Sequence, residues 1–254
     1  MSDRIMLKIG GSVITDKSGT CSINHERLAS VAAAVAGSGA SGLVIVHGAG
    51  SCGHPEAKQY GLEHGVAAGH ATGIAITHHA VSRLNREVVA ALREHGTEAL
   101  GVHPLHGAFA DKGRIVAFES LHLEKMLALG MVPVIHGDVV MDRSRGACII
   151  SGDQLVRCLA PLLGTGRVGL ATDVPGVLKG GAVVPVITPA SADALQVGSS
   201  TYTDVTGGMR GKINELLDLA RAGVGSEIFH VSRIPDFLVG RDCGGTKIRM
   251  KGEV

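Results

Sequence analysis

Short apolar runs alternate with helical runs along this chain, and small glycine clusters directly follow several of the apolar runs. Ile5–Ile9 precedes Gly10-Gly11, and Leu43–His47 precedes Gly48-Ala49-Gly50. A continuous apolar run such as Leu43–His47 is typical of a strand that is covered on both faces. Alternation of strand and helix implies a mainly parallel sheet with helices on both sides. We therefore predict an α/β fold.

Hydrophobic periodicity places the remaining elements. The longest helix is expected over residues 71–95, because apolar residues from Ile74 to Leu92 recur at helical spacing. Further helices are expected after Asn24 and over 120–129, 153–163 and 211–222, and further strands over 98–102, 132–136, 167–171, 227–231 and 246–250. Gly164-Thr165-Gly166 is the best candidate for a boundary between an N-terminal lobe, residues 1–165, and a C-terminal lobe, residues 166–254.

Composition excludes several functional classes. The 254 residues carry 24 basic and 23 acidic side chains without a basic stripe, so no duplex-binding surface is indicated. Four phenylalanines and two tyrosines are too few for single-strand stacking. The five cysteines are odd in number and lack C-x-x-C spacing, which argues against a zinc ribbon or a disulfide framework and favours a reducing compartment. No signal-peptide pattern is present, and a turn cluster interrupts the uncharged stretch from Leu28 to Pro55, so we expect a cytoplasmic protein without membrane insertion.

The glycine clusters indicate a phosphate ligand. In open parallel sheets, ligands bind at the carboxyl ends of the strands, and glycine there lets backbone N–H groups approach an anion. Helix N-termini that follow such loops add positive potential. Lys8, Lys17 and Lys212 accompany these loops. A polyanionic ligand therefore explains the pattern better than ordinary turns do.

Two common phosphate-binding motifs fit poorly. The P-loop pattern is absent, because Thr206 holds the first-glycine position before Gly211-Lys212 and Ile213 follows the lysine. The run from Gly48 to Gly53 matches a dinucleotide fingerprint, but residues 64–86 contain no Asp or Glu to hold a ribose. His78-His79 with His103 and His106 suggests a metal cluster only weakly, because no typical ligand spacing supports it.

Five motifs in order along the chain resemble the amino acid kinase superfamily and, within it, the isopentenyl phosphate kinases. The opening motif is Leu7–Lys17, with Lys8-Ile9-Gly10-Gly11-Ser12 at its centre. The others are Val46–Pro55, Val132–Val140, Ile150–Gln154 and Asp204–Lys212. The resemblance implies an open αβα sandwich with a central, mainly parallel sheet. It further implies transfer of the γ-phosphoryl group of ATP to isopentenyl phosphate, in an alternative mevalonate route to isoprenoids, with Mg²⁺ and in a homodimer. The N-terminal lobe would hold the acceptor and the C-terminal lobe the nucleotide.

The roles of the nucleotide-side residues follow from electrostatics. An acceptor phosphate is already anionic at neutral pH, so the site must overcome repulsion between two anions rather than supply a base. Lys8 and Lys212 are candidates to bridge the β- and γ-phosphates, with Asp153 as the negative anchor between them. Asp153 could alternatively cap the helix that starts at Gln154. Other expected ATP-binding residues are Lys17, Gly10, Gly11, Ser12, Thr172, Asp173 and Gly208.

The acceptor phosphate is expected at the second glycine loop. His54 would hydrogen-bond one of its nonbridging oxygens, although a purely local helix-start role is the alternative. The surrounding substrate-binding residues are expected to be Gly48, Ala49, Gly50, Gly53 and Gly152. Ile74, His78 and Val81 lie near one face of the following helix and could line a pocket for the hydrocarbon tail, or could be plain core.

Two departures from the family pattern and two alternative functions remain open. Thr172-Asp173-Val174-Pro175-Gly176 replaces the usual Thr-Asp-Val-Asp-Gly, and Gly-Ala-Gly replaces Gly-Gly-Gly. The first departure leaves the contacts to the nucleotide base open, because proline lacks a donor and stiffens the loop. The alternatives are a fosfomycin kinase, which also uses an anionic acceptor, and a nucleotide-sensing protein that binds ATP without transfer.

Overall fold

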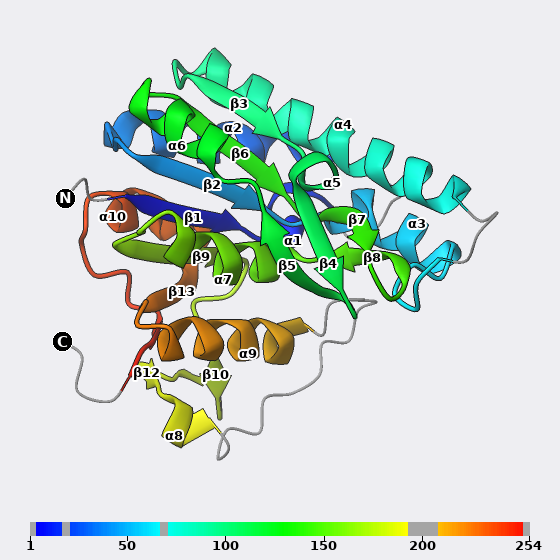
Figure 1. The fold of residues 1–254 in the computed structure, drawn as a ribbon. Helices are drawn as coiled ribbons and strands as arrows, with labels where there is room; N and C mark the ends of the chain where they lie inside the picture. The colour runs from blue at the N-terminus through cyan, green and yellow to red at the C-terminus, as the bar shows by residue number, and fades with distance from the viewer. Residues whose placement is uncertain (1–3, 17–20, 67–70, 193–207, 251–254) are drawn as a thin grey trace.

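A computed structural model describes residues 4–16, 21–66, 71–192 and 208–250. Its centre is an eight-stranded sheet in the order β12-β14-β13-β9-β1-β2-β6-β3 (Figure 1). All neighbouring strands pair in parallel except β13 and β14. The strands are β1 (Ile5–Ile9), β2 (Leu43–His47), β3 (Ala99–Val102), β6 (Val132–His136), β9 (Arg167–Thr172), β12 (Val186–Ile187), β13 (Ser226–His230) and β14 (Thr246–Ile248).

Alternate side chains along the strands of the sheet pack into two separate cores, one on each face. On β1, Ile5, Leu7 and Ile9 join one buried cluster, whereas Met6 joins the other. The first cluster is covered by α2 (His25–Ser38), α4 (Thr72–Glu94) and α10 (Ile234–Leu238), and the second by α6 (Leu121–Ala128), α7 (Gly152–Leu162) and α9 (Gly208–Arg221). The expected open αβα sandwich is thus confirmed (Figure 1).

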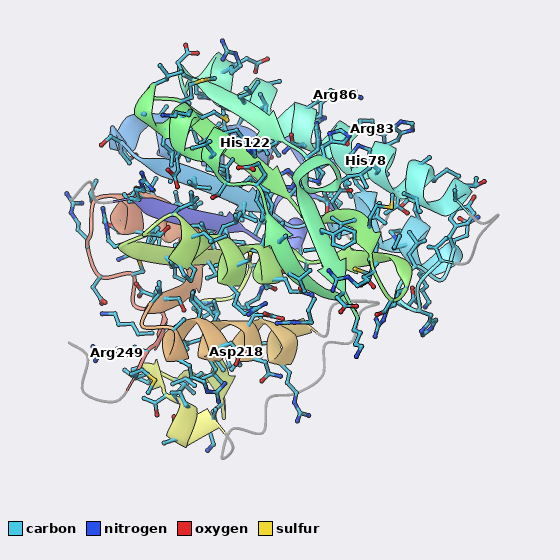
Figure 2. All side chains as sticks on the ribbon, viewed as in Figure 1. His78, Arg83, Arg86, His122, Asp218 and Arg249 are labelled. Atoms are coloured by element: carbon cyan, nitrogen blue, oxygen red, sulfur yellow. A yellow bond between two sulfur atoms is a disulfide. The ribbon has the colours of Figure 1, made fainter. Side chains whose placement is uncertain are left out.

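The longest helix illustrates how the sequence specifies an element. Val81, Leu84, Val88 and Leu92 are buried on one side of α4, whereas Arg83 and Arg86 are exposed and extend from it (Figure 2). This period-3.6 pattern packs one stripe against the sheet and leaves the charges in solvent. No helix in the described part of the chain is long and apolar enough to span a membrane.

A four-stranded sheet, in the order β5-β4-β7-β8, was not anticipated from the sequence. It comprises β4 (Ala108–Asp111), β5 (Arg114–Phe118), β7 (Asp138–Asp142) and β8 (Gly146–Ile150). Asp142 accepts backbone N–H bonds from Gly113 and Arg145 and so joins the turns of the two hairpins.

The smaller elements are α1 (Gly11–Ile14), α3 (His54–Gln59), α5 (Pro104–Gly107), α8 (Pro189–Ala192), β10 (Leu178–Lys179), β11 (Ala182–Val183) and the 3-10 turns Gly50–Cys52 and Val231–Arg233.

The cysteines require a correction. A disulfide joins Cys21 to Cys52, whereas the sequence analysis argued against disulfide bonding. The Cys21 N–H donates to the Ser51 carbonyl at 2.9 Å, which brings the two segments together although 31 positions separate the thiols. Cys148, Cys158 and Cys243 are free.

Candidate active site

The carboxyl ends of β1, β2 and β9 open into a cavity of about 950 Å³. These three strands are neighbours in the sheet, so the loops that follow them meet at one edge. The N-terminal ends of α3, α7 and α9 border the same space. Partial positive charge at helix N-termini and exposed loop amides make such an edge suited to anions.

A buried trio of charges lies at the cavity wall. Lys8 Nζ lies 3.0 Å from Asp153 Oδ1, and Lys212 Nζ lies 3.1 Å from both Asp153 oxygens. Lys8 comes from β1, Asp153 from the first turn of α7 and Lys212 from α9. Two ammonium groups against one carboxylate leave a net positive charge that faces the cavity. That arrangement can hold the negative oxygens of a phosphoryl group.

Burial and mutual charge set the ionisation of this trio. Burial lowers the pKa of Lys8 to about 8, and the neighbouring Lys212 acts in the same direction while Asp153 opposes it. Burial alone would raise the pKa of Asp153, but Lys212 and Lys8 outweigh it and hold that pKa well below its usual range. Asp153 therefore stays ionised at neutral pH, and Lys8 is poised to lose its proton at mildly alkaline pH.

Asp153 does not cap its helix. The N-cap of α7 is Ser151, whose hydroxyl accepts from the Gln154 N–H at 3.1 Å. Asp153 lies two positions further on, inside the first turn, where its carboxylate points at the lysines. The alternative role of Asp153 as the cap is therefore wrong.

The first two glycine loops pack directly against each other. A Cβ added to Gly11 would lie 2.3 Å from the Gly50 nitrogen, and one added to Gly50 would lie 2.2 Å from Thr15 Oγ1. Gly50 also has a φ of +55°, which L side chains rarely adopt. The sequence analysis assigned these glycines to phosphate approach; the structure adds that contact between the loops itself requires them.

The cavity lining also includes a histidine and apolar side chains. His54 is the first residue of α3 and lines the cavity with Pro55. Val81 from α4 and Ile149 from β8 add apolar surface to the lining. A lining of this kind can hold a ligand with one polar and one hydrocarbon part.

All the predicted catalytic, ATP-binding and acceptor-binding residues that the structure describes line this one cavity. They are Lys8, Gly10, Gly11, Ser12, Gly48, Ala49, Gly50, Gly53, His54, Gly152, Asp153, Thr172, Asp173, Gly208 and Lys212. Lys17 lies outside the described residues, as do positions 204–207 of the last motif. The Thr172 hydroxyl has one hydrogen and lies 2.8 Å from the Val174 carbonyl oxygen and 3.2 Å from that of Phe229, so it holds the loop that contains Pro175.

Sequence reasoning missed several lining residues. Thr15 Oγ1 accepts from the Ser51 N–H at 3.0 Å, and both residues line the cavity. Asp138, at the start of β7, also lines it. Asp138 lies inside the Val132–Val140 motif, directly after a strand and a glycine, and this position could have identified it as a site residue. Thr77 on α4 lies in none of the five motifs.

Comparison with known proteins assigns the chain to a family. Residues 3–230 match the Amino acid kinase family. The chain belongs to this family. It is 42% identical over 247 residues to the isopentenyl phosphate kinase of Haloferax volcanii, covering 96% of this chain and 98% of the relative.

Solved structures agree with this family assignment. The fold matches an isopentenyl phosphate kinase crystal structure with a TM-score of 0.86 and 35% identity, covering 96% of this chain and 99% of the other. A product complex of the T. acidophilum isopentenyl phosphate kinase matches with a TM-score of 0.78 and 26% identity, covering 97% and 100%. The resemblance inferred from the five motifs is thereby confirmed.

Proposed function

We propose that this chain transfers the γ-phosphoryl group of ATP to isopentenyl phosphate, giving isopentenyl diphosphate and ADP. The observation that carries the proposal is the cavity itself, in which the Lys8–Asp153–Lys212 trio and the His54 loop line one continuous space. The Haloferax volcanii relative and the crystal structure with the TM-score of 0.86, each matching 96% of this chain, carry this activity in their names.

The transfer is direct and in line. A nonbridging oxygen of the acceptor phosphate forms the new bond to the γ-phosphorus while the bond from that phosphorus to the β–γ bridging oxygen breaks, and ADP leaves. The attacking oxygen is already anionic, because the second pKa of a phosphate monoester is about 6. Lys8 and Lys212 neutralise the transferring group, and the amides of the glycine loops with His54 hold the acceptor.

Mg²⁺ enters with the nucleotide in this proposal. Both carboxylate oxygens of Asp153 contact lysine ammonium groups at 3.0–3.1 Å. We therefore do not expect Asp153 to bind the metal ion. We therefore expect Mg²⁺ to be held by the ATP phosphates, where it adds to the charge neutralisation that the lysines provide.

The two lobes of the chain hold different substrates in this proposal. The acceptor lies in residues 1–165 and the nucleotide mainly against residues 166–254, although Lys8 and Gly10–Ser12 reach across from the first lobe. We also propose that the protein is a homodimer and that it acts in the cytoplasm.

A coupled ADP-release assay tests the proposal with isopentenyl phosphate and fosfomycin as competing acceptors. We expect turnover with isopentenyl phosphate and formation of a diphosphate visible by phosphorus NMR. Preferential turnover of fosfomycin would favour the phosphonate alternative, and ATP binding without turnover of either would favour a nucleotide sensor. Either result would overturn the proposal.

A further inference from the structure

A pair of stacked histidines directly precedes two glycines that line the cavity. His47 ends β2 and His136 ends β6, and the two are register partners in the sheet. Their rings are 5.6 Å apart at 24°, and both side chains are fully buried. Each is followed by a glycine that lines the cavity, Gly48 and Gly137 respectively. The proposed phosphoryl transfer uses neither ring.

Each ring makes a hydrogen bond to the carbonyl group of the glycine that follows it. Nδ1 of His47 lies 3.0 Å from the Gly48 carbonyl oxygen, and Nδ1 of His136 lies 3.0 Å from the Gly137 carbonyl oxygen. A carbonyl oxygen only accepts, so each Nδ1 carries the hydrogen. Burial lowers the pKa of His47 to about 4 and that of His136 to about 3, so both rings are neutral at pH 7 and each Nε2 is an acceptor.

Surrounding donors lock these tautomers. The Asn85 amide donates to His47 Nε2 at 3.0 Å and, with its second hydrogen, to the Val134 carbonyl at 3.1 Å. Nδ1 of His103 lies 2.8 Å from His136 Nε2 and therefore donates to it. Every polar atom of the two rings thus has a partner that permits only the Nδ1–H form.

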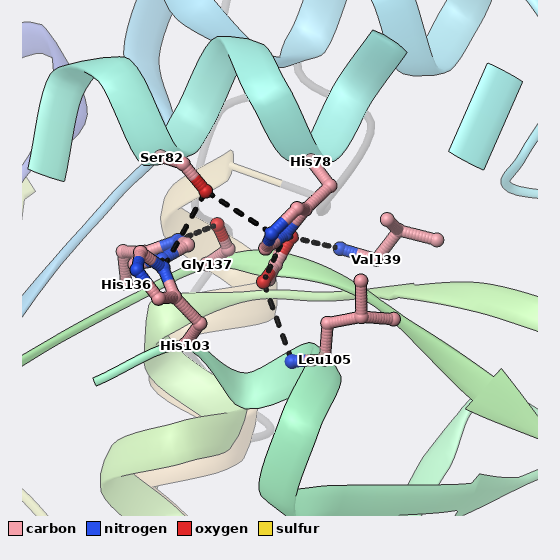
Figure 3. Close-up of polar contacts among 8 residues, drawn as sticks. His78, Ser82, His103, Leu105, His136, Gly137 and Val139 are labelled. Atoms are coloured by element: carbon pink, nitrogen blue, oxygen red, sulfur yellow. Dashed lines mark hydrogen bonds and ion pairs between the residues drawn. The ribbon is translucent and has the colours of Figure 1, made fainter. Parts of the chain in front are cut away.

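The network continues from His103 through Ser82 to His78 (Figure 3). Ser82 Oγ lies 3.4 Å from His103 Nδ1 and 3.3 Å from His78 Nε2. Nδ1 of His78 donates to the Asp138 carboxylate at 3.0–3.1 Å, and this hydrogen bond raises the pKa of His78. Asp138 also accepts from the N–H groups of Leu105 and Val139. Within the described residues no group of His, Cys, Asp and Glu is arranged to hold a metal ion, so the cluster is better explained as a hydrogen-bond scaffold.

The direction of the glycine peptides follows from these bonds. The carbonyl and N–H of a trans peptide point in opposite directions. With the Gly48 carbonyl held on the His47 ring, the Ala49 N–H points away from the ring, and Ala49 lines the cavity. Within residues 4–16, 21–66, 71–192 and 208–250, no oxygen accepts this N–H. Ala49 is half-buried at the cavity, and an N–H there without a protein acceptor is available to a ligand oxygen.

We propose that His47 and His136 are positioning residues that fix the Gly48–Ala49 and Gly137–Asp138 peptides at the cavity, and that His47 thereby orients the Ala49 N–H toward the acceptor phosphate. The inference rests on the proposed function, since it specifies how that acceptor is held. It assigns no chemical step to the rings. Asn85 and His103 are the residues that keep them in the required tautomer.

Paired substitutions at His47 isolate the bond to Gly48. His47→Asn keeps an N–H donor near the Nδ1 position, whereas His47→Leu is of similar size and has none; both lose the acceptor for Asn85. We expect His47→Leu to raise the KM for isopentenyl phosphate about 10-fold, the effect of one hydrogen bond worth about 1.4 kcal/mol. The KM for ATP should stay within about twofold, and His47→Asn should restore the acceptor KM to within about threefold of the wild type.

His95→Leu is the matched control, because His95 Nδ1 also lies against a carbonyl, that of Ala91 at 2.8 Å, but on the exposed end of α4. It should change neither KM. An unchanged acceptor KM in His47→Leu, or an equal rise in His47→Asn, would overturn the inference. Absence of wild-type turnover of isopentenyl phosphate would instead contradict the proposed function.

A second measurement does not depend on turnover or on variants that fold. Two-bond proton–nitrogen NMR correlations of the wild-type imidazole rings at pH 7 report each tautomer. We expect Nδ1–H for both His47 and His136. An Nε2–H or doubly protonated ring at either position would overturn the inference even if the enzyme phosphorylates isopentenyl phosphate.

Discussion

At the scale of single residues, the proposed role of the buried lysine of β1 predicts a pH dependence. In the proposed transfer Lys8 is charged when it holds the phosphoryl group, and burial lowers its pKa to about 8. We expect kcat/KM for ATP to fall above pH 8, since this quantity reports the free enzyme. The fall in kcat should come at higher pH, because the bound triphosphate favours the charged ammonium. Initial rates from pH 6 to 10 test this; a flat kcat/KM up to pH 9.5 would contradict it.

The same lysine affects stability in the opposite sense. Its pKa in the folded protein lies below the ordinary value of 10.5, so between about pH 8 and 10.5 the unfolded chain binds more protons at this position. The contribution of Lys8 to stability therefore rises with pH in that window while activity falls. The ionisation of Lys8 by itself therefore does not favour unfolding as activity falls above pH 8.

Replacing Asp153 should lower both the turnover number and the melting temperature. Asp153→Asn would leave two buried ammonium groups without their carboxylate. Breaking a buried ion pair in this way costs about 3–5 kcal/mol. We expect a lower melting temperature that MgATP partly restores, because phosphate oxygens replace the missing charge, and a kcat reduced by about 10²-fold or more. Thermal unfolding with and without MgATP tests this, and a melting temperature equal to that of the wild type would contradict it.

His54 provides a separate test at the acceptor end. His54→Ala should raise the KM for isopentenyl phosphate about 10-fold or more, the loss of a hydrogen bond to a charged group, and largely spare the affinity for ATP. His64→Ala is the control, because His64 is exposed and does not line the cavity. Acceptor kinetics that are the same in both variants would remove His54 from the site.

At the scale of elements, the contact between the glycine loops is a stability determinant. Gly11→Ala would place a methyl group 2.3 Å from the Gly50 nitrogen, so we expect a destabilisation of more than 1 kcal/mol. Gly37→Ala is the matched control: Gly37 lies inside α2 with nothing within 4 Å, and alanine there should stabilise by about 0.5–1 kcal/mol. Urea unfolding measures both, and effects of the same sign would contradict this explanation.

The elements also show how far the sequence could be interpreted. β1, β2 and β6 were predicted with the bounds observed, because each of these apolar runs ends directly before a glycine. The strands of the small sheet were not, since β7 begins and ends with aspartate and its pairing with β4 joins distant segments. The site residues followed from motifs. The histidine network did not, because His47, His78, His103 and His136 meet only after β2, α4, β3 and β6 have assembled.

At the scale of the whole molecule, assembly remains a prediction. The edge strand β3 leaves Leu100 exposed, and Leu121 and Leu129 are exposed at the two ends of α6. We expect a homodimer with twice the 26.0 kDa mass of one chain. Sedimentation equilibrium at micromolar concentration measures this mass. A single 26.0 kDa species at all concentrations would contradict the prediction.

The central claim is that two anionic substrates meet head to head in one cavity. A crystal structure with a non-hydrolysable ATP analogue and isopentenyl phosphate tests it most directly. The γ-phosphate should contact Lys8 and Lys212, and the acceptor phosphate should lie within hydrogen-bond distance of His54 and the Ala49 N–H. A triphosphate bound away from both lysines, or an acceptor phosphate bound outside the His54 loop, would contradict the account.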